Sequence, residues 1–125
     1  MCGIFGYVSA SVDTDGRAAD TVLHGLRKLE YRGYDSWGIA VVHERGIALE
    51  KRVGKIGEAV TRLPESASGL GHTRWATHGG VTQPNAHPHL DCAGRVALIH
   101  NGMVSNYREL FRYAHDASLE NKLRF

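Results

Sequence analysis

The chain has 125 residues, a length that suits one domain, and we do not expect a second. Its 15 basic and 13 acidic residues are spread along the sequence, without the Lys/Arg run typical of a nucleic-acid or membrane surface. It has two cysteines, no basic leader with an apolar core and no apolar run long enough to span a bilayer. We therefore expect a reduced, cytoplasmic protein that binds neither nucleic acid nor membrane.

The first predicted element is a buried strand over residues 4–8, and Cys2 lies two residues before its start. Removal of Met1 would give Cys2 a free α-amine, and such amines titrate at about 7.7 to 8.0 in model peptides, a range suited to a general base. Thiol and base would then belong to one residue, as in enzymes whose N-terminal amine activates the nucleophile. The alternative is that Cys2 is simply a small buried residue near the terminus.

A helix is predicted from near Arg17, with Asp15 or Thr14 as its cap. Its apolar face consists of Ala19, Val22, Leu23, Leu26 and Leu29, which recur at helical spacing. Residues 39–42 read as a buried strand, and residues 43–46 as a hairpin turn into an antiparallel strand over 47–52. Residues 55–63 favour a short helix that Pro64 ends.

The second half alternates short apolar runs with polar loops. A short strand near residue 71 is predicted to lead into a loop over 81–89 that is rich in Gly, Pro, Asn and His. Residues 96–99 predict another buried strand, which ends at His100-Asn101-Gly102. Asn106 and Glu109 form a capping pair for a last helix, whose apolar face is Tyr107, Leu110, Phe111 and Ala114.

Five histidines invite a metal interpretation: His72, His78, His87, His89 and His100. We do not expect a metal site, because neither a His-Glu-x-x-His helix nor a Cys-x-x-Cys pair is present. A phosphate-binding glycine loop is also missing from the sequence. We therefore expect no cofactor.

The polar residues fit a nucleophilic cysteine better, since that chemistry needs an activated thiol, donors for an oxyanion and a substrate clamp. Cys2 supplies the thiol, while Asn101 and the backbone N–H of Gly102 offer two donors. Arg74 can hold a carboxylate through its planar fork. The alternatives are a plain turn at Asn101-Gly102 and a surface ion pair for Arg74.

Five stretches of the sequence together resemble one known family. They are Met1-Cys2-Gly3-Ile4-Phe5-Gly6, Leu29-Glu30-Tyr31-Arg32-Gly33-Tyr34-Asp35-Ser36, Gly71-His72-Thr73-Arg74-Trp75-Ala76-Thr77-His78-Gly79, Asn85-Ala86-His87-Pro88-His89 and His100-Asn101-Gly102. The chain closely resembles the glutaminase domain, a class II glutamine amidotransferase domain, of the glutamine-fructose-6-phosphate aminotransferases, or glucosamine-6-phosphate synthases. The resemblance implies an α+β N-terminal-nucleophile hydrolase fold, the four-layer αββα sandwich. Periodicity alone supports a mixed αβ domain.

The resemblance also implies roles for particular residues. Cys2 matches the family's nucleophile, and Asn101 and Gly102 match its oxyanion donors. Arg74 matches the arginine that binds the glutamine α-carboxylate, and the matching substrate-pocket residues are Thr77, His78 and His87. Trp75 matches the gate for ammonia. Trp37 departs from the family, which more often has a small residue there.

Residues 114–125 depart further, because they lack the family's Thr-Asp-Thr-Glu motif, whose aspartate binds the substrate α-amino group. We expect residues 1–125 to be a partial, truncated glutaminase domain with an atypical tail over 114–125. The implied activity is hydrolysis of L-glutamine, with ammonia converting fructose 6-phosphate to glucosamine 6-phosphate through an isomerase domain absent here. The alternative is a catalytically inactive remnant, at most a protein-interaction module. The sequence is also compatible with a homo-oligomer.

Overall fold

The computed structural model describes residues 1–10 and 17–115. The proposed caps Thr14 and Asp15 lie outside these residues. The elements in chain order are β1 (Gly3–Val8), α2 (Ala18–Leu29), a 3-10 turn η1 (Glu30–Arg32), β2 (Ser36–His43), β3 (Gly46–Val53), β4 (Ser68–Arg74), β5 (His89–Leu90), β6 (Ala97–Leu98) and α3 (Tyr107–His115).

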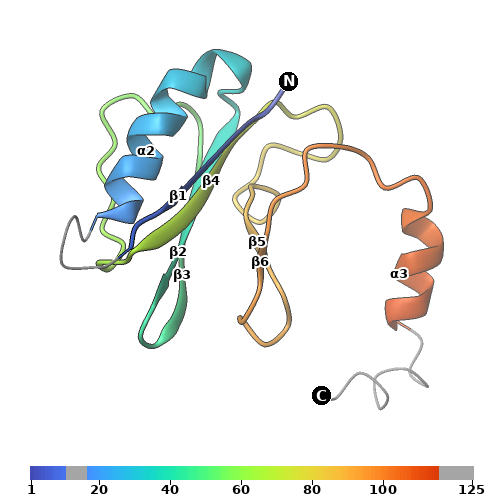
Figure 1. Cartoon of the computed structure of the whole chain (residues 1–125). Coiled ribbons are helices and arrows are strands. Elements are labelled where there is room, and N and C mark those ends of the chain that lie inside the picture. The colour runs from blue at the N-terminus through green and yellow to red at the C-terminus, as the bar shows by residue number, and fades with distance from the viewer. Residues whose placement is uncertain (11–16, 116–125) are drawn as a thin grey trace.

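Four of the strands form one antiparallel sheet in the order β1-β4-β2-β3 (Figure 1). The predicted hairpin is confirmed, because β2 pairs with β3 from Ser36↔Val53 to His43↔Gly46. β4 lies between β1 and β2, so Thr73 pairs with Gly3 on one side and with Trp37 on the other. The start of the chain is thereby placed beside the end of β4.

Helix α2 covers one face of this sheet, and the main core lies between them (Figure 1). The predicted helical face is confirmed, since Val22, Leu23 and Leu26 are buried against Ile39 and Val41. Burying a side chain of this size contributes about 1.5 to 3 kcal/mol. The core therefore fixes α2 and the central strands as one unit.

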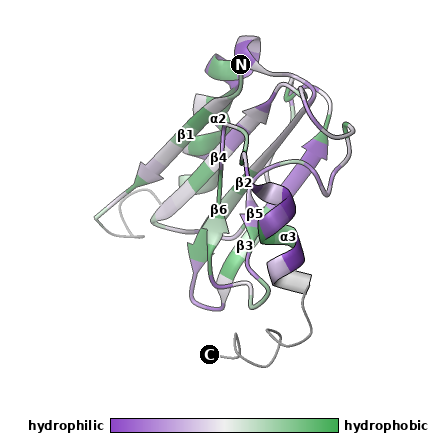
Figure 2. Ribbon diagram, turned by 90° about the vertical axis from the view of Figure 1, so that its right-hand side faces the viewer, coloured by the Kyte–Doolittle hydropathy of each residue, from purple (hydrophilic) through white to green (hydrophobic). Residues whose placement is uncertain are grey.

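The opposite face of the sheet is less covered. A separate two-stranded sheet of β5 and β6 stands beside it, and Ala97 of β6 lines a largely apolar cavity of about 340 Å³ together with residues of β1, β2, β3 and β4. Val8 and Val42 of the four-stranded sheet are exposed, and apolar positions recur along its strands in Figure 2. The fold is α+β, and the described residues contain one helical layer packed on the four-stranded sheet.

The helix predicted over residues 55–63 is wrong, because side chains from α2 and η1 bind the backbone of that segment. The guanidinium of Arg27 donates to the carbonyl oxygens of Gly57 and Ala59, and the backbone N–H of Ile56 donates to the Glu30 carboxylate. Gly57 also has a φ of +48°, outside the right-handed helical region. The segment is therefore irregular apart from a turn at Gly57, and it lies beside Arg27 of α2.

Two other expectations are partly corrected. The buried strand expected over residues 96–99 is a two-residue strand, β6, and Val96 and Leu98 are exposed. The last helix, α3, forms as predicted, but Leu110 and Phe111 on its apolar face are exposed. No helix in the part of the chain that the structure describes is long and apolar enough to cross a membrane.

Candidate active site

A cavity of about 330 Å³ lies where the first strand begins and β4 ends. All the site residues predicted from the sequence line it. The complete lining is Cys2, Arg74, Trp75, Thr77, His78, His87, His100, Asn101, Gly102 and Met103. The sequence patterns do not predict a site role for His100 and Met103. Only their position next to Asn101-Gly102 in the chain indicates that they lie at the site. Four separate stretches of the chain thus converge on one space.

Cys2 is half-buried at the edge of this cavity. Its sulfur accepts a hydrogen bond from the backbone N–H of Trp75, with a nitrogen-to-sulfur distance of 3.3 Å. The carbonyl oxygen of Cys2 accepts from the Asn101 side-chain amide and from Arg32 Nε, each at 3.4 Å. Cys2 is thus held at the cavity by hydrogen bonds to its sulfur and to its carbonyl oxygen.

Arg74 is 8% exposed, so its expected alternative as a surface ion pair is wrong. Its guanidinium donates to the carbonyl oxygens of Gly80, at 3.0 Å, and His78. No carboxylate among the described residues forms an ion pair with it. Because these partners are neutral, they do not compensate the charge of the guanidinium, which can therefore bind an anion that enters the cavity.

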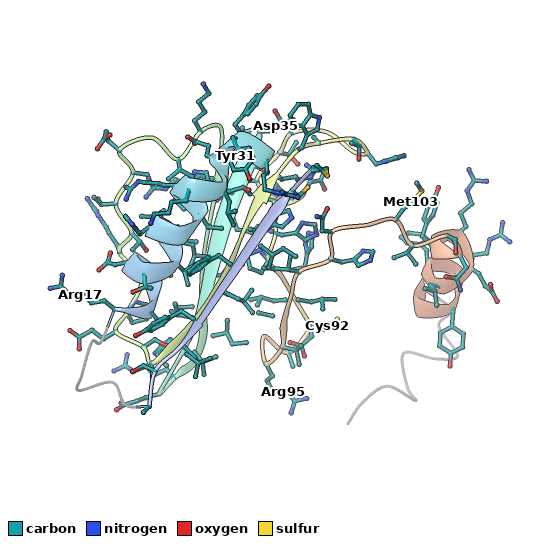
Figure 3. The ribbon with its side chains drawn as sticks, turned by 45° about the horizontal axis from the view of Figure 1, so that its top comes forward. Arg17, Tyr31, Asp35, Cys92, Arg95 and Met103 are labelled. Carbon is teal, nitrogen blue, oxygen red and sulfur yellow. The ribbon has the colours of Figure 1, made fainter. Side chains whose placement is uncertain are left out.

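The loop after β4 is tied to the start of β2 by Asp35, a residue to which the sequence patterns assigned no site role. The backbone N–H of Asp35 donates to the carbonyl of Arg74 at 3.0 Å, and the N–H of Ala76 donates to Asp35 Oδ2 at 2.8 Å. Figure 3 shows Asp35 at the end of the sheet where the chain begins. Beside it, the rings of Trp75 and Tyr34 lie 5.6 Å apart.

Three histidines stand in a row, and the middle one, His87, lines the cavity. The ring of His87 lies 4.5 Å from those of both His72 and His89, edge to face in each case. Burial, reinforced by the neighbouring His87, lowers the pKa of His72 to about 3, and burial lowers the pKa of His87 to about 4. Both rings are therefore neutral near pH 7.

The row is packed closely on the sheet. A Cβ added to Gly38 of β2 would lie 2.3 Å from the carbonyl oxygen of His87, so glycine is needed for this approach. Both ring nitrogens of His72 lack hydrogen-bond partners among the described residues. No group of three or more His, Cys, Asp or Glu side chains within residues 1–10 and 17–115 is placed to hold a metal ion.

The fold has counterparts among solved amidotransferase structures. It matches glutamine phosphoribosylpyrophosphate amidotransferase from B. subtilis with a TM-score of 0.64 and 26% identity, over 99% of this chain and 25% of that one. It matches the allosteric regulatory enzyme of purine biosynthesis with a TM-score of 0.66 and 27% identity, again over 99% and 25%. The described residues therefore match part of the N-terminal-nucleophile domain of class II amidotransferases.

The sequence is more similar to a group of aminotransferases than to these two solved structures. The glutamine–fructose-6-phosphate aminotransferases of Corynebacterium efficiens and Thermus thermophilus are 52% and 56% identical over 116 and 114 residues, 88% of this chain in each case. That of Bacillus licheniformis is 49% identical over 97% of it. No protein-family model matches the chain. The chain is a homologue of the N-terminal glutamine amidotransferase region of these aminotransferases, and it spans about a fifth of their length.

Proposed function

We propose that this chain carries the glutaminase chemistry of a class II glutamine amidotransferase, with Cys2 as the nucleophile. One observation carries the proposal: the thiol, the oxyanion donors and the carboxylate clamp expected from separate motifs all line the same cavity. The volume of about 330 Å³ suits a small molecule.

The reaction begins at Cys2 once Met1 has been removed. Met1 is 78% exposed, so its peptide bond is open to an aminopeptidase. The freed α-amine accepts the thiol proton as sulfur bonds to the side-chain carbonyl carbon of glutamine. The same amine then returns the proton to the leaving nitrogen, and ammonia departs as the thioester forms. Water hydrolyses this thioester to glutamate and restores the thiol.

Asn101 and Gly102 serve the tetrahedral intermediate. The Asn101 amide group already lies 3.4 Å from the Cys2 carbonyl, and the backbone N–H of Gly102 belongs to the same lining. Two neutral donors aimed at the developing oxyanion stabilise it without adding a charge of their own. Such donors contribute about 2.7 to 4 kcal/mol each where they have been removed in other enzymes.

Arg74 binds the α-carboxylate of the substrate, because its buried guanidinium has no carboxylate partner among the described residues. Thr77 and His78 form the adjoining wall, where the Thr77 hydroxyl and His78 Nδ1 lie 3.1 Å apart. His87 contributes a neutral ring, so it does not repel the cationic end of an amino acid.

Trp75 gates the passage of ammonia, with its half-exposed ring over the cavity. In the complete enzyme, the ammonia would convert fructose 6-phosphate to glucosamine 6-phosphate. There the four-stranded sheet would be one of two sheets packed face to face between helical layers. Residues 1–125 would then be a partial glutaminase domain that works in the cytoplasm and uses no cofactor.

The test is covalent labelling of the folded, Met1-free chain with a glutamine-like electrophile, followed by peptide mass spectrometry. Adduct is expected on Cys2 and not on Cys92, which is exposed and lies outside the cavity. Excess glutamine is expected to slow labelling of Cys2. A folded chain without adduct at Cys2 excludes the nucleophile assignment.

A second candidate is a catalytically inactive remnant that associates with other proteins through its sheet. The exposed Val8 and Val42 on the less covered face of the sheet favour it. Measurement of glutamine hydrolysis on the purified chain, beside circular dichroism, separates the two functions. Turnover that Cys2→Ala abolishes excludes the remnant, whereas a folded chain without turnover supports it.

A further inference from the structure

We propose that Asp35 is a positioning residue for the nucleophile, acting by fixing the peptide group that donates to the Cys2 sulfur. The proposal rests on the proposed function of Cys2. Asp35 does not line the cavity, and its effect passes through the backbone between Arg74 and Ala76.

Asp35 holds this backbone at the point where the sheet ends. The last pair of β2 and β4 is Ser36↔Arg74, so no strand residue of β2 is left to pair with Trp75 or Ala76. Asp35 takes over that role with two bonds: its N–H donates to the Arg74 carbonyl at 3.0 Å, and its carboxylate accepts from the Ala76 N–H at 2.8 Å. The segment is thus fixed from the β2 side.

The direction of the Trp75 N–H follows from this attachment. Successive N–H groups of an extended chain point to opposite sides, so an Ala76 N–H directed at β2 leaves the Trp75 N–H directed at β1. Cys2 lies on that side, immediately before β1, and its sulfur receives the Trp75 N–H at 3.3 Å. One carboxylate immediately before β2 thereby orients the donor for a sulfur immediately before β1.

A second contact holds the same peptide in place. A Cβ added to Gly33 would lie 2.6 Å from the Arg74 carbonyl carbon and 2.8 Å from the Trp75 nitrogen. The backbone of Gly33 therefore packs directly on the peptide group that serves Cys2. Asp35 itself is anchored, because its carbonyl accepts from the Gly54 N–H at 2.8 Å. The donor is clamped by a connected set of backbone contacts.

The test measures the reactivity of Cys2 and does not require turnover. The full chain is treated with iodoacetamide at pH 7, and peptide mass spectrometry gives the ratio of the alkylation rates of Cys2 and Cys92, the latter serving as an internal reference. Asp35→Ala is expected to lower this ratio about tenfold, because the Trp75 donor is no longer held on the sulfur. Asp35→Asn keeps an oxygen acceptor of the same reach and is expected to stay within about twofold of wild type.

The exposed Asp20 of α2 supplies a matched control, and Asp20→Ala is expected to leave the ratio unchanged. An unchanged ratio in folded Asp35→Ala overturns the proposal. The proposal is also overturned if the ratio in Asp35→Asn falls as far as in Asp35→Ala or rises above that of the wild type. In either case the charge of Asp35, and not its hydrogen bond, would determine the reactivity of Cys2.

If Asp35→Ala does not fold, Asp35→Ser replaces it. Serine keeps a polar oxygen, but its side chain is too short to accept the hydrogen bond from the Ala76 N–H. A ratio for Asp35→Ser equal to that for Asp35→Asn contradicts the proposal. Failure of this proposal and failure of the proposed function can be told apart. A chain that fails to hydrolyse glutamine, yet whose Cys2 reactivity depends on Asp35, retains the positioning role while the glutaminase assignment fails.

Discussion

The side-chain amide nitrogen of Asn101 lies 3.4 Å from the carbonyl oxygen of Cys2, although 99 positions separate the two residues in the chain. Cys2 is fixed by the four-stranded sheet, whereas Asn101 follows the separate β5-β6 pair. Their contact joins the two sheets at the cavity. The proposed oxyanion donors are thus held by a part of the fold that does not hold the proposed nucleophile.

Substitution of Asn101 is expected to reduce catalysis without unfolding the protein. Asn101→Ala and the isosteric Asn101→Asp both remove an amide donor, so the kcat of glutamine hydrolysis should fall about 10²- to 10³-fold. Because Asn101 is exposed, the urea midpoint should change little. Asn106→Ala, outside the cavity, is the control. Full activity of Asn101→Ala would contradict the oxyanion role.

Arg74→Lys is expected to weaken substrate binding more than the chemical step. Lysine keeps the charge but loses the planar fork, so KM for glutamine should rise about 10- to 100-fold while kcat falls less. Arg52→Lys supplies the matched control, since Arg52 is exposed on β3 and pairs with Glu50. Initial rates against glutamine concentration give both constants. A lower kcat at unchanged KM would count against carboxylate binding by Arg74.

The site could be predicted from the sequence because its residues lie in short local motifs at strand ends. The short strand predicted near residue 71 is β4, which ends at Arg74 beside Trp75, and the apolar run before His100 and Asn101 contains β6. Local patterns of this kind locate the ends of strands. The resemblance of the five motifs to one family then predicts that these strand ends belong to a common site.

Long-range contacts explain what the sequence could not predict. Residues 55–63 have a helical pattern, but the carbonyls of Gly57 and Ala59 accept hydrogen bonds from Arg27, which is distant in sequence. The exposure of Leu98 could not be foreseen either, because an apolar run indicates burial without showing what covers it. The link between Asp35 and Ala76 depends on the register of β2 and β4, which composition does not reveal.

Gly38→Ala is expected to destabilise the fold and displace the loop that carries His87. The new Cβ would lie 2.3 Å from the His87 carbonyl oxygen and 2.9 Å from that of Glu50, and neither backbone can move freely. Overpacking of this kind costs about 1 to 3 kcal/mol. Gly6→Ala on β1 is the matched control, because its Cβ would meet nothing closer than 3.9 Å. Urea unfolding curves compare the two variants, and equal midpoints would contradict the tight approach.

The histidine row should make the folded state lose stability in mild acid. His72 and His87 have folded pKa values of about 3 and about 4, below the ordinary histidine value of 6.5. At a pH between the folded and unfolded pKa values, the unfolded chain binds more protons than the folded one. The contribution of these histidines to the free energy of unfolding is therefore complete above about pH 6.5 and falls as the pH drops toward the folded pKa values. Near pH 5 unfolding should take up about two protons through these two side chains.

His72→Phe tests this linkage at its most buried member. Phenylalanine retains an aromatic ring beside His87 and removes two nitrogens that have no partner among the described residues. Urea unfolding at several pH values between about 4.5 and 7.5 should therefore show a slope smaller by about one proton, with unchanged or greater stability at the upper end of that range. The exposed His24→Gln on α2 is the control. If the stability of His72→Phe depends on pH as that of the wild type does, the pKa of His72 does not differ between the folded and unfolded states, and the prediction is wrong.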